Sequence, residues 1–237
     1  MTVLNLNLAF PTPSFAVVGA SDRVGSVGEV VLRNIIAGGF AGGVYPVNPR
    51  HTSLAGLPCY PRAADLPEAP GLAVIITPPE TVPGLIGEFG VRGTRLAVVI
   101  TAGIGVEGGL RQRMLDAARP YLLRVIGPNT IGLLSPRAAL NASFVHIAPA
   151  MGKLGLISQS GAMVSSIIDW AAASGIGFSQ VFSLGDMADV DVGDALNLLA
   201  TDDKTSAILM YLESIPAPRK FRAAARGAAR GASHFVG

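Results

Sequence analysis

Residues 15–28 read FAVVGASDRVGSVG and predict the first strand and the first turn of an open α/β sheet. The apolar run at residues 15–19 is short and β-branched, as strands buried on both faces are. A glycine-rich turn follows it, and then residues 27–37 show helical periodicity up to a stop at Gly38. A strand that leads through such a turn into a helix is the building unit of doubly wound sheets.

The same alternation of apolar strands and amphipathic helices continues along the chain. Further strands are predicted at residues 43–47, 72–76, 96–100, 123–126, 153–157, 177–184 and 207–212, and further helices at 80–90, 107–121, 162–173, 192–200 and 219–230. The pattern pauses over residues 127–152, which we interpret as the connection between two α/β units. We expect an extension at residues 1–13, a first domain at 14–135, an interdomain segment at 136–152 and a second domain at 153–237. Since no strand is predicted after the last helix, we expect the second domain to be truncated.

Composition excludes several classes of protein. The 237 residues are 50% hydrophobic and 14% charged, so they can bury a large core, and a net charge of +2 argues against a nucleic-acid partner. Apolar runs of about five to eight residues are far shorter than the roughly 20 of a membrane span, and we find no signal peptide. The single cysteine, Cys59, allows neither an internal disulfide nor a cysteine metal cluster. We expect a cytoplasmic protein without a metal site or a membrane partner.

The turn after the first strand is the first candidate ligand site. In open parallel sheets, ligands lie beyond the carboxyl ends of the strands, and a glycine-rich turn exposes backbone N–H groups there. This turn contains Gly19, Ser21, Gly25, Ser26 and Gly28. The pattern predicts a phosphate at the helix N-terminus, with a tight turn that binds nothing as the alternative.

Two features bear on which phosphate-bearing ligand binds. The glycines at positions 19, 25 and 28 are further apart than those of the dinucleotide fingerprint G-x-G-x-x-G. After the second strand come Asn48, Pro49 and Arg50, where an NAD-binding protein carries an acidic residue for the ribose hydroxyls. A cation at this place can pair with a ribose phosphate. The sequence disfavours NAD and leaves NADP or coenzyme A (CoA).

Small and polar residues follow the later strands. Thr77 and Pro78 follow the third strand, Thr101 and Ala102 the fourth, and Asn129 lies in a Gly-Pro-Asn turn after the fifth. None of them is an acid or base suited to proton transfer. They predict a smooth wall for an adenosine or a pantetheine arm, with ordinary loop residues as the alternative.

An ordered series of motifs resembles one family. VVGAS, VYPVNPR, ITPPE, VVITAG, IGPNTIG, KLGLISQSGAM, SLGD and YLE occur in this order within about residues 14–226. They resemble the CoA-binding domain and the following ligase domain of ADP-forming acetyl-CoA (acyl-CoA) synthetases, relatives of the succinyl-CoA synthetase alpha subunit. LNASF, GKLGLISQS, IDWA and DKTSAILMYLE look in particular like the synthetase-like region of bacterial protein lysine acetyltransferases. The resemblance implies a Rossmann-like CoA-binding domain followed by an incomplete flavodoxin-like ligase domain.

The resemblance also implies roles for individual residues. CoA phosphates would lie on the glycine-rich turn, and the rest of the molecule would contact the ends of the following strands. The residues expected to bind CoA or acyl-CoA are Gly19, Ser21, Gly25, Ser26, Val27, Gly28, Asn48, Pro49, Arg50, Thr77, Pro78, Ile100, Thr101, Ala102 and Asn129. In the second domain, Ser160 and Gly161 match the helix start that holds the phosphoryl group of a phosphohistidine, and Glu213 matches the acid that orients that histidine.

The chain departs from the family pattern at the phosphorylated histidine. We expect His51 and His146 at the surface, and His234 follows Glu213 too closely for the strand and glycine-rich segment that the family places between them. We therefore identify no phosphohistidine and expect the isolated chain to be inactive as a ligase. ATP or ADP with Mg²⁺ would bind only to an ATP-grasp part, either a beta subunit or a C-terminal domain. Bare apolar surface would favour an oligomer, and Thr130 and Ser165 leave the acid substrate open.

Three functions remain open from the sequence. The first is the CoA-binding, alpha-like part of an ADP-forming acyl-CoA synthetase. The second is an acetyl-CoA-sensing regulatory region of a protein lysine acetyltransferase, without ligase chemistry. The third and weakest is an NADP-dependent oxidoreductase.

Overall fold

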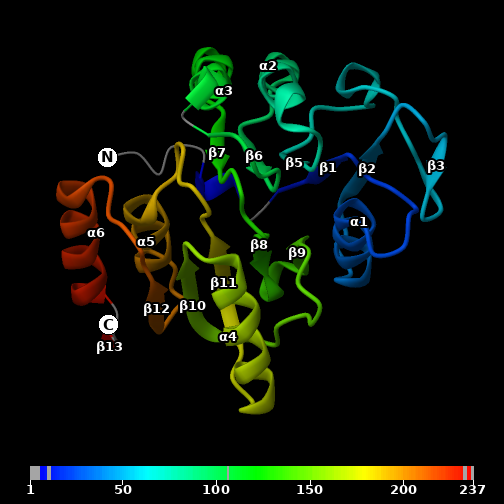
Figure 1. Ribbon diagram of the computed structural model, residues 1–237. Coiled ribbons are helices and arrows are strands. Elements are labelled where there is room, and N and C mark those ends of the chain that lie inside the picture. Colours follow the sequence, from blue (N-terminus) through cyan, green and yellow to red (C-terminus); the bar gives the residue numbers. More distant parts are fainter. Residues whose placement is uncertain (1–5, 10–11, 106, 232–233, 236–237) are drawn as a thin grey trace.

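The computed structural model describes residues 6–9, 12–105, 107–231 and 234–235 and arranges them around two β-sheets (Figure 1). The first sheet has five strands in the order β2-β1-β5-β6-β7, and the second has six in the order β13-β12-β10-β11-β8-β9. A separate hairpin joins β3 (Ser53–Leu54) and β4 (Leu57–Pro58). The predicted α/β fold with two successive units is confirmed.

The first sheet is entirely parallel. Its strands are β1 (Ser14–Val18), β2 (Gly43–Val47), β5 (Leu72–Ile75), β6 (Leu96–Val99) and β7 (Arg124–Ile126). Its helices are α1 (Val27–Ala37), α2 (Val82–Arg92) and α3 (Leu110–Ala118). The strand order reverses between β1 and β5, so their carboxyl ends form the switch point at which open sheets bind ligands.

Both faces of the first sheet are covered. Helices α2 and α3 lie on one face, and α1 and the second sheet lie on the other (Figure 1). Along β1, Ala16 and Val18 belong to the core beneath α2 and α3, whereas Phe15 and Val17 share a core with Phe182 of the second sheet. This double burial explains why β1 is apolar throughout and does not alternate.

The second sheet is mixed. Its strands are β8 (Gly132–Ser135), β9 (Leu140–Ser143), β10 (Met151–Ser158), β11 (Phe178–Ser183), β12 (Ala207–Tyr211) and β13 (His234–Phe235). Its helices are α4 (Gly161–Ala173), α5 (Val192–Ala200) and α6 (Pro218–Gly231). Short 3₁₀ turns complete the chain at Leu6–Ala9, Ala63–Asp65, Pro79–Thr81, Glu107–Gly109, Arg119–Tyr121 and Pro136–Ala138. Within the described ranges, no helix combines the length and the apolar character needed to cross a membrane.

Two expectations about the second sheet are wrong. The segment expected only to connect the two units contains β8 and β9, which form an antiparallel pair at the edge of the second sheet. These strands have four residues each, all buried, and are too short to show a period in the sequence. The expectation that no strand follows the last helix is also wrong. Strand β13 comes after α6 and pairs in parallel with the start of β12.

The segment of residues 185–190 joins the two sheets. It follows β11 of the second sheet and runs beside β7, the edge strand of the first. Its backbone N–H groups donate to that edge from Val190 to Val125 (3.1 Å), from Ala188 to Gly127 (2.9 Å) and from Asp186 to Pro128 (2.9 Å). The junction thus consists of backbone hydrogen bonds along the β7 edge of the first sheet. These bonds fix how the two sheets face each other.

An ion cluster adds to this junction. Arg124, the first residue of β7, donates to Asp189 (2.8 Å) and Asp194 (3.2 Å). Lys220 of α6 lies 2.8 Å from both Asp191 and Asp194. Burial alone would lower the pKa of the Lys220 ammonium, but its hydrogen bonds to the two aspartates and their charges raise that pKa above its ordinary value. The cluster holds α5 and α6 against the edge of the first sheet.

Replacing Arg124 with Met should destabilise the fold. The Arg124 side chain is only 13% exposed, and its removal leaves Asp189 without this cation inside the junction. We expect the free energy of unfolding, measured by urea denaturation, to fall by about 3 kcal/mol, as when one partner of a buried ion pair is removed. Arg33→Met is the matched control, because Arg33 is 59% exposed in its pair with Glu29. This replacement should lower the free energy of unfolding by less than about 1 kcal/mol. Equal losses in the two variants would contradict a special role for Arg124.

Candidate functional site

The turn after β1 is shaped by close backbone approaches. Gly19 has a φ of +88°, and a Cβ placed on it would lie 2.8 Å from the carbonyl oxygen of Ile76. A Cβ on Gly28 would lie 2.1 Å from the carbonyl oxygen of Gly19. Helix α1 can begin directly against the end of β1 only because neither position carries a side chain. The turn therefore presents the first N–H groups of α1 at the switch point.

The N-terminus of α1 is organised by its own side chains. The Ser26 hydroxyl caps the helix by accepting from the Glu29 backbone N–H (3.3 Å). The Glu29 carboxylate in turn accepts from the Gly25 backbone N–H (3.2 Å) and pairs with Arg33 (2.8 Å). The Glu29 carboxylate thus lies at the helix end where the positive end of the helix dipole favours negative charge.

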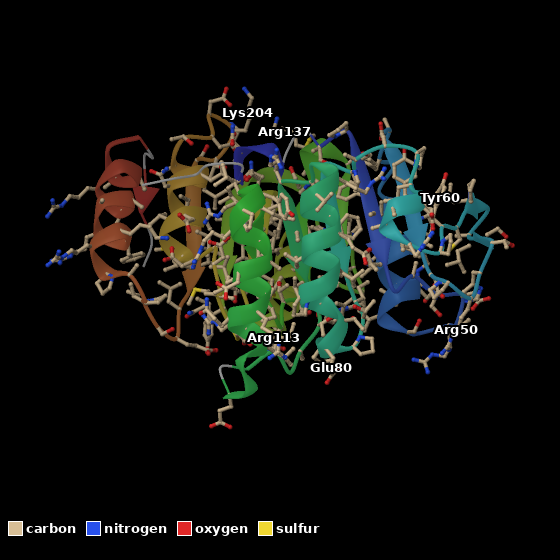
Figure 2. All side chains as sticks on the ribbon, turned by 90° about the horizontal axis from the view of Figure 1, so that it is seen from above. Arg50, Tyr60, Glu80, Arg113, Arg137 and Lys204 are labelled. Carbon is tan, nitrogen blue, oxygen red and sulfur yellow. The ribbon has the colours of Figure 1, made fainter. Side chains whose placement is uncertain are left out.

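Asn48 ties the end of β2 to the glycine-rich turn. Its side-chain amide donates to the Ala20 carbonyl (2.7 Å) and its oxygen accepts from the Arg50 backbone N–H (2.9 Å). Arg50 is exposed, and Figure 2 shows it along the same edge of the molecule as Glu80, which lies just before α2. The Asn48 side chain thereby fixes where the Arg50 backbone sits relative to the turn.

A cavity of about 690 Å³ opens beside this turn, and we call it the loop cavity. Its lining residues are Gly19, Ser21, Arg23, Ser26, Val27, Gly28, Asn48, Arg50, His51, Ile76 and Pro78. Three of them, Arg23, Arg50 and His51, carry basic side chains, and His51 Nδ1 lies 3.8 Å from Asp22. Arg23 was not predicted as a site residue, and His51 was predicted only to lie at the surface. The position of His51 directly after the predicted site residue Arg50 could have indicated its place in this cavity.

A second cavity of about 580 Å³, the rim cavity, adjoins the loop cavity on its outer side. The two share Gly19, Asn48, Arg50 and Pro78. The rim cavity is further lined by Val18, Val47, Pro49, Pro61, Arg62, Thr77, Thr81, Gly84, Leu85 and Glu88. Several of these are proline or aliphatic side chains, so this cavity offers flat apolar contact for a ring.

A third cavity of about 640 Å³, the inner cavity, lies where the carboxyl ends of both sheets meet. It shares Val27 and Ile76 with the loop cavity. Its other lining residues are Thr77, Ile100, Thr101, Ala102, Asn129, Thr130, Ile131, Phe144, Gln159, Ser160, Gly161, Ala162, Gly185, Asp186 and Glu213. Only Asp186 and Glu213 of this lining are charged side chains. The three cavities adjoin one another through shared lining residues, and together we call them the groove.

Hydrogen bonds between loops fix the wall of the inner cavity. The Thr101 hydroxyl donates to the Thr77 carbonyl (2.7 Å), which joins the ends of β6 and β5. The Asn129 side chain donates to Asp186 (3.1 Å), which joins the two units across the cavity. These polar groups are engaged in holding the wall, in agreement with a surface that contacts a ligand without reacting with it.

The groove brings together the residues predicted from the sequence. Each of them lines one of the three cavities except Gly25, which has a φ of +75° and no atom within 4 Å of the position of a Cβ. Ser160 caps α4 by accepting from the Met163 backbone N–H (3.4 Å), and Glu213 faces the same cavity from the turn after β12. Gln159, which belongs to the SQSGA motif matched to the phosphoryl-holding helix start, also lines it, as do Phe144 and Asp186, for which no role was predicted from the sequence.

Neither of the other two histidines lies in the inner cavity. His146 pairs with Asp169 on the exposed side of α4 (3.0 Å). The backbone of His234 pairs with Ala207, the first residue of β12, whereas Glu213 lies beyond the other end of that strand. Within the described part of the chain, no three carboxylate, imidazole or thiol groups gather as a metal site.

Two protein families match this chain. Residues 13–136 match the family described as CoA binding domain, and residues 151–234 match the succinyl-CoA ligase like flavodoxin domain. The first match covers the sheet that carries the glycine-rich turn, and the second covers β10 to the first residue of β13 with α4, α5 and α6.

Curated proteins and solved structures are similar over nearly the whole chain. Acetate–CoA ligase [ADP-forming] I of Archaeoglobus fulgidus is 40% identical and aligns with 91% of this chain and 32% of its own length. The alpha subunit of acetate–CoA ligase [ADP-forming] I of Pyrococcus furiosus is 34% identical, with coverage of 94% and 50%. The structure of acetyl-coenzyme A synthetase 1 of Ca. Korarchaeum cryptofilum in complex with phosphate and ADP superposes with a TM-score of 0.92 at 38% identity, covering 97% of this chain and 50% of that one. The chain thus spans between a third and a half of the length of these relatives.

Replacing Gly28 with Ala tests the packing of α1 onto β1. The new methyl group would overlap the Gly19 carbonyl, so we expect the free energy of unfolding to fall by about 1–3 kcal/mol, as for other overpacked sites. Gly87→Ala in α2 is the control, because a Cβ there meets nothing within 4 Å and should change stability by less than about 1 kcal/mol. Urea denaturation of both variants measures the difference. A Gly28→Ala protein as stable as the control would show that α1 does not depend on this contact.

Proposed function

Since this chain belongs to the CoA-binding domain family and is related to the alpha parts of ADP-forming acyl-CoA synthetases, we propose that it binds CoA or acyl-CoA along the groove. The observation that carries the proposal is the continuity of the rim, loop and inner cavities through shared lining residues. CoA has a ring system, a group of phosphates and a long uncharged arm that ends in a thiol. The rim cavity offers proline and aliphatic side chains, the loop cavity offers basic ones, and the described lining of the inner cavity has no basic side chain.

The phosphates of CoA would lie in the loop cavity. The first turn of α1 supplies N–H groups and the positive end of the helix dipole, which attract phosphate. Arg23, Arg50 and His51 surround the same cavity, and an arginine can bind a phosphate through two parallel hydrogen bonds. Of these, Arg50 is held by the Asn48 side chain, and we assign it to the ribose phosphate.

The adenine would lie in the rim cavity and the pantetheine arm would run into the inner cavity. Pro49, Pro61 and Leu85 give the rim cavity flat apolar contacts for the ring. Val27 and Ile76 border both the loop and the inner cavity, and the arm would pass along these two uncharged side chains. The thiol of CoA would then reach the space between the sheets, where Ser160, Gly161 and Glu213 lie.

We further propose that the complete protein is an acid–thiol ligase. The overall reaction joins a carboxylic acid to the CoA thiol while ATP is converted to ADP and phosphate. In this reaction the N-terminus of α4, capped by Ser160, would hold a phosphoryl group carried by a histidine, and Glu213 would orient that histidine. An ATP-grasp subunit or domain would bind the nucleotide. The relation to alpha subunits and the match of the second sheet to a succinyl-CoA ligase like domain support this proposal.

An acetyl-CoA-sensing region of a lysine acetyltransferase remains a prediction. It would bind the same ligand in the same groove, so binding of CoA does not separate it from the ligase. The two functions differ in the catalytic domain that accompanies this chain. The DNA sequence beyond the codon for Gly237 tests this difference, because an ATP-grasp region supports the ligase and an acetyltransferase region supports the sensor.

Replacing Arg50 with Ala should weaken CoA binding through the ribose phosphate. We expect the binding free energy of CoA to weaken by roughly 1–3 kcal/mol, which raises Kd about 5- to 150-fold. This is the range for a hydrogen bond to a charged group. Isothermal titration calorimetry with CoA and with dephospho-CoA, which lacks that phosphate, measures the effect. Wild type should prefer CoA, and the Arg50→Ala variant should bind the two ligands almost equally.

Arg33→Ala is the control for a general effect of positive charge. Arg33 is exposed and lies outside all three cavities, so its removal should leave the preference for CoA unchanged. If Arg50→Ala retains the wild-type preference, Arg50 does not bind the ribose phosphate. If wild type binds neither ligand, the proposed function is wrong.

A further inference from the structure

The side chain of Gln159 contacts two other segments at the inner cavity, the turn at Glu213 and the segment of residues 185–190. Gln159 follows the last residue of β10 and precedes Ser160, the N-cap of α4. It is only 9% exposed, so its amide must find partners within the protein. No role has been assigned to Gln159 in the proposed binding of CoA.

All polar atoms of the Gln159 amide are engaged. Its oxygen accepts from the backbone N–H groups of Glu213 and of Ser214, the latter at 2.9 Å. Its nitrogen donates to the Ser214 hydroxyl (3.1 Å) and contacts the sulfur of Met187 (3.4 Å). The opposite orientation of the amide would place its N–H groups against two backbone donors, so the contacts define which atom is oxygen.

These contacts fix the turn that carries Glu213. Glu213 lies beyond the end of β12 and is exposed, and the structure assigns no helix or strand between Tyr211 and Pro218. The Gln159 backbone N–H also donates to the Tyr211 carbonyl (3.1 Å), so Gln159 holds the chain on both sides of Leu212. The place of the Glu213 carboxylate relative to the start of α4 therefore depends on one neighbouring side chain.

Gln159 also determines which groups can bind an anion here. Two successive backbone N–H groups, such as those of Glu213 and Ser214, form an arrangement that commonly binds anions. The neutral Gln159 oxygen occupies both of them. The first N–H groups of α4, which begins two residues after Gln159, are then the donors that we expect an anion in the inner cavity to use.

Met187 connects this arrangement to the first sheet. Its carbonyl accepts from the Arg111 side chain of α3 (3.0 Å), and it belongs to the segment of residues 185–190 that pairs with β7. The nitrogen end of the Gln159 amide thus contacts a segment that is fixed to the CoA-binding unit. Gln159 directly precedes the N-cap of α4, and its side chain contacts both the Glu213 turn and the junction between the sheets.

We propose that Gln159 is a positioning residue that holds Glu213 in register with the N-terminus of α4, so that both face the same phosphoryl group. This inference rests on the proposed ligase function for its consequence in the reaction. The placement of the Glu213 turn itself does not depend on that function and can be measured separately.

Two substitutions separate the acceptor from the side chain as a whole. Gln159→Leu keeps a similar size but removes the acceptor, so the amide hydrogens of Glu213 and Ser214 should exchange with solvent at least about tenfold faster. Gln159→Glu keeps an acceptor in the same place, so both amides should stay protected. Gln180→Leu is the control, because it removes a glutamine from β11 whose nitrogen contacts Asp202 and not this turn. Residue-resolved hydrogen exchange by NMR measures all three variants.

The functional consequence is measured in the ligase reaction with the ATP-grasp part present. Gln159→Leu should lower kcat at least about tenfold with a much smaller effect on KM for CoA, because Glu213 is displaced while the loop cavity, which Gln159 does not line, is unchanged. Unchanged exchange of the Glu213 and Ser214 amides in Gln159→Leu would overturn the proposal, and so would an unchanged kcat. If wild type neither binds CoA nor forms acyl-CoA, the proposed function fails, whereas the exchange data still decide whether Gln159 fixes the turn.

Discussion

The junction between residues 185–190 and β7 is the constraint on which the rest of the site depends. Backbone hydrogen bonds continue the pairing of the first sheet into a segment that belongs to the second, and Arg124 and Lys220 reinforce them through one shared aspartate, Asp194. Ligands of parallel sheets bind at the carboxyl ends of the strands. Because the junction turns those ends of both sheets toward one space, two ordinary binding edges become a single groove.

Local constraints made much of this structure predictable from sequence. Strands such as β1, buried on both faces, leave an uninterrupted apolar run, and the close approach of Gly28 to Gly19 leaves no room for a Cβ without a shift of the backbone. The helix boundaries of α1 and α5 follow from Ser26 and Asp191, whose side chains cap the first turns. The predicted CoA-binding residues lie together because each follows a strand, and neighbouring strands end at the same edge. Their assignment to particular parts of CoA remains a proposal.

The features that sequence did not predict depend on contacts between distant residues. Gln159 acquires its partners from a turn 54 and 55 residues away, and nothing in its own neighbourhood indicates them. His51 stands in a polar turn that resembles any surface loop, and it reaches the loop cavity only because Asn48 fixes that turn against Ala20. Strands β8 and β9 are short, and their burial comes from pairing with β11, which a local pattern does not record.

The distribution of charge gives the groove a direction. Arg23, Arg50 and His51 surround the loop cavity, whereas the charged side chains of the inner cavity are the carboxylates Asp186 and Glu213. In the proposed complex, the phosphates of CoA would therefore be attracted to the loop cavity and repelled from the inner one, which would favour entry of the uncharged arm between the sheets. Any phosphoryl group in the inner cavity must overcome the same two carboxylates. Since the described lining there has no lysine or arginine, the positive end of α4, equivalent to about half a charge, is the source of attraction that remains. Small displacements of Glu213 relative to α4 would then shift this balance, which is why the anchoring of one exposed turn matters to the chemistry.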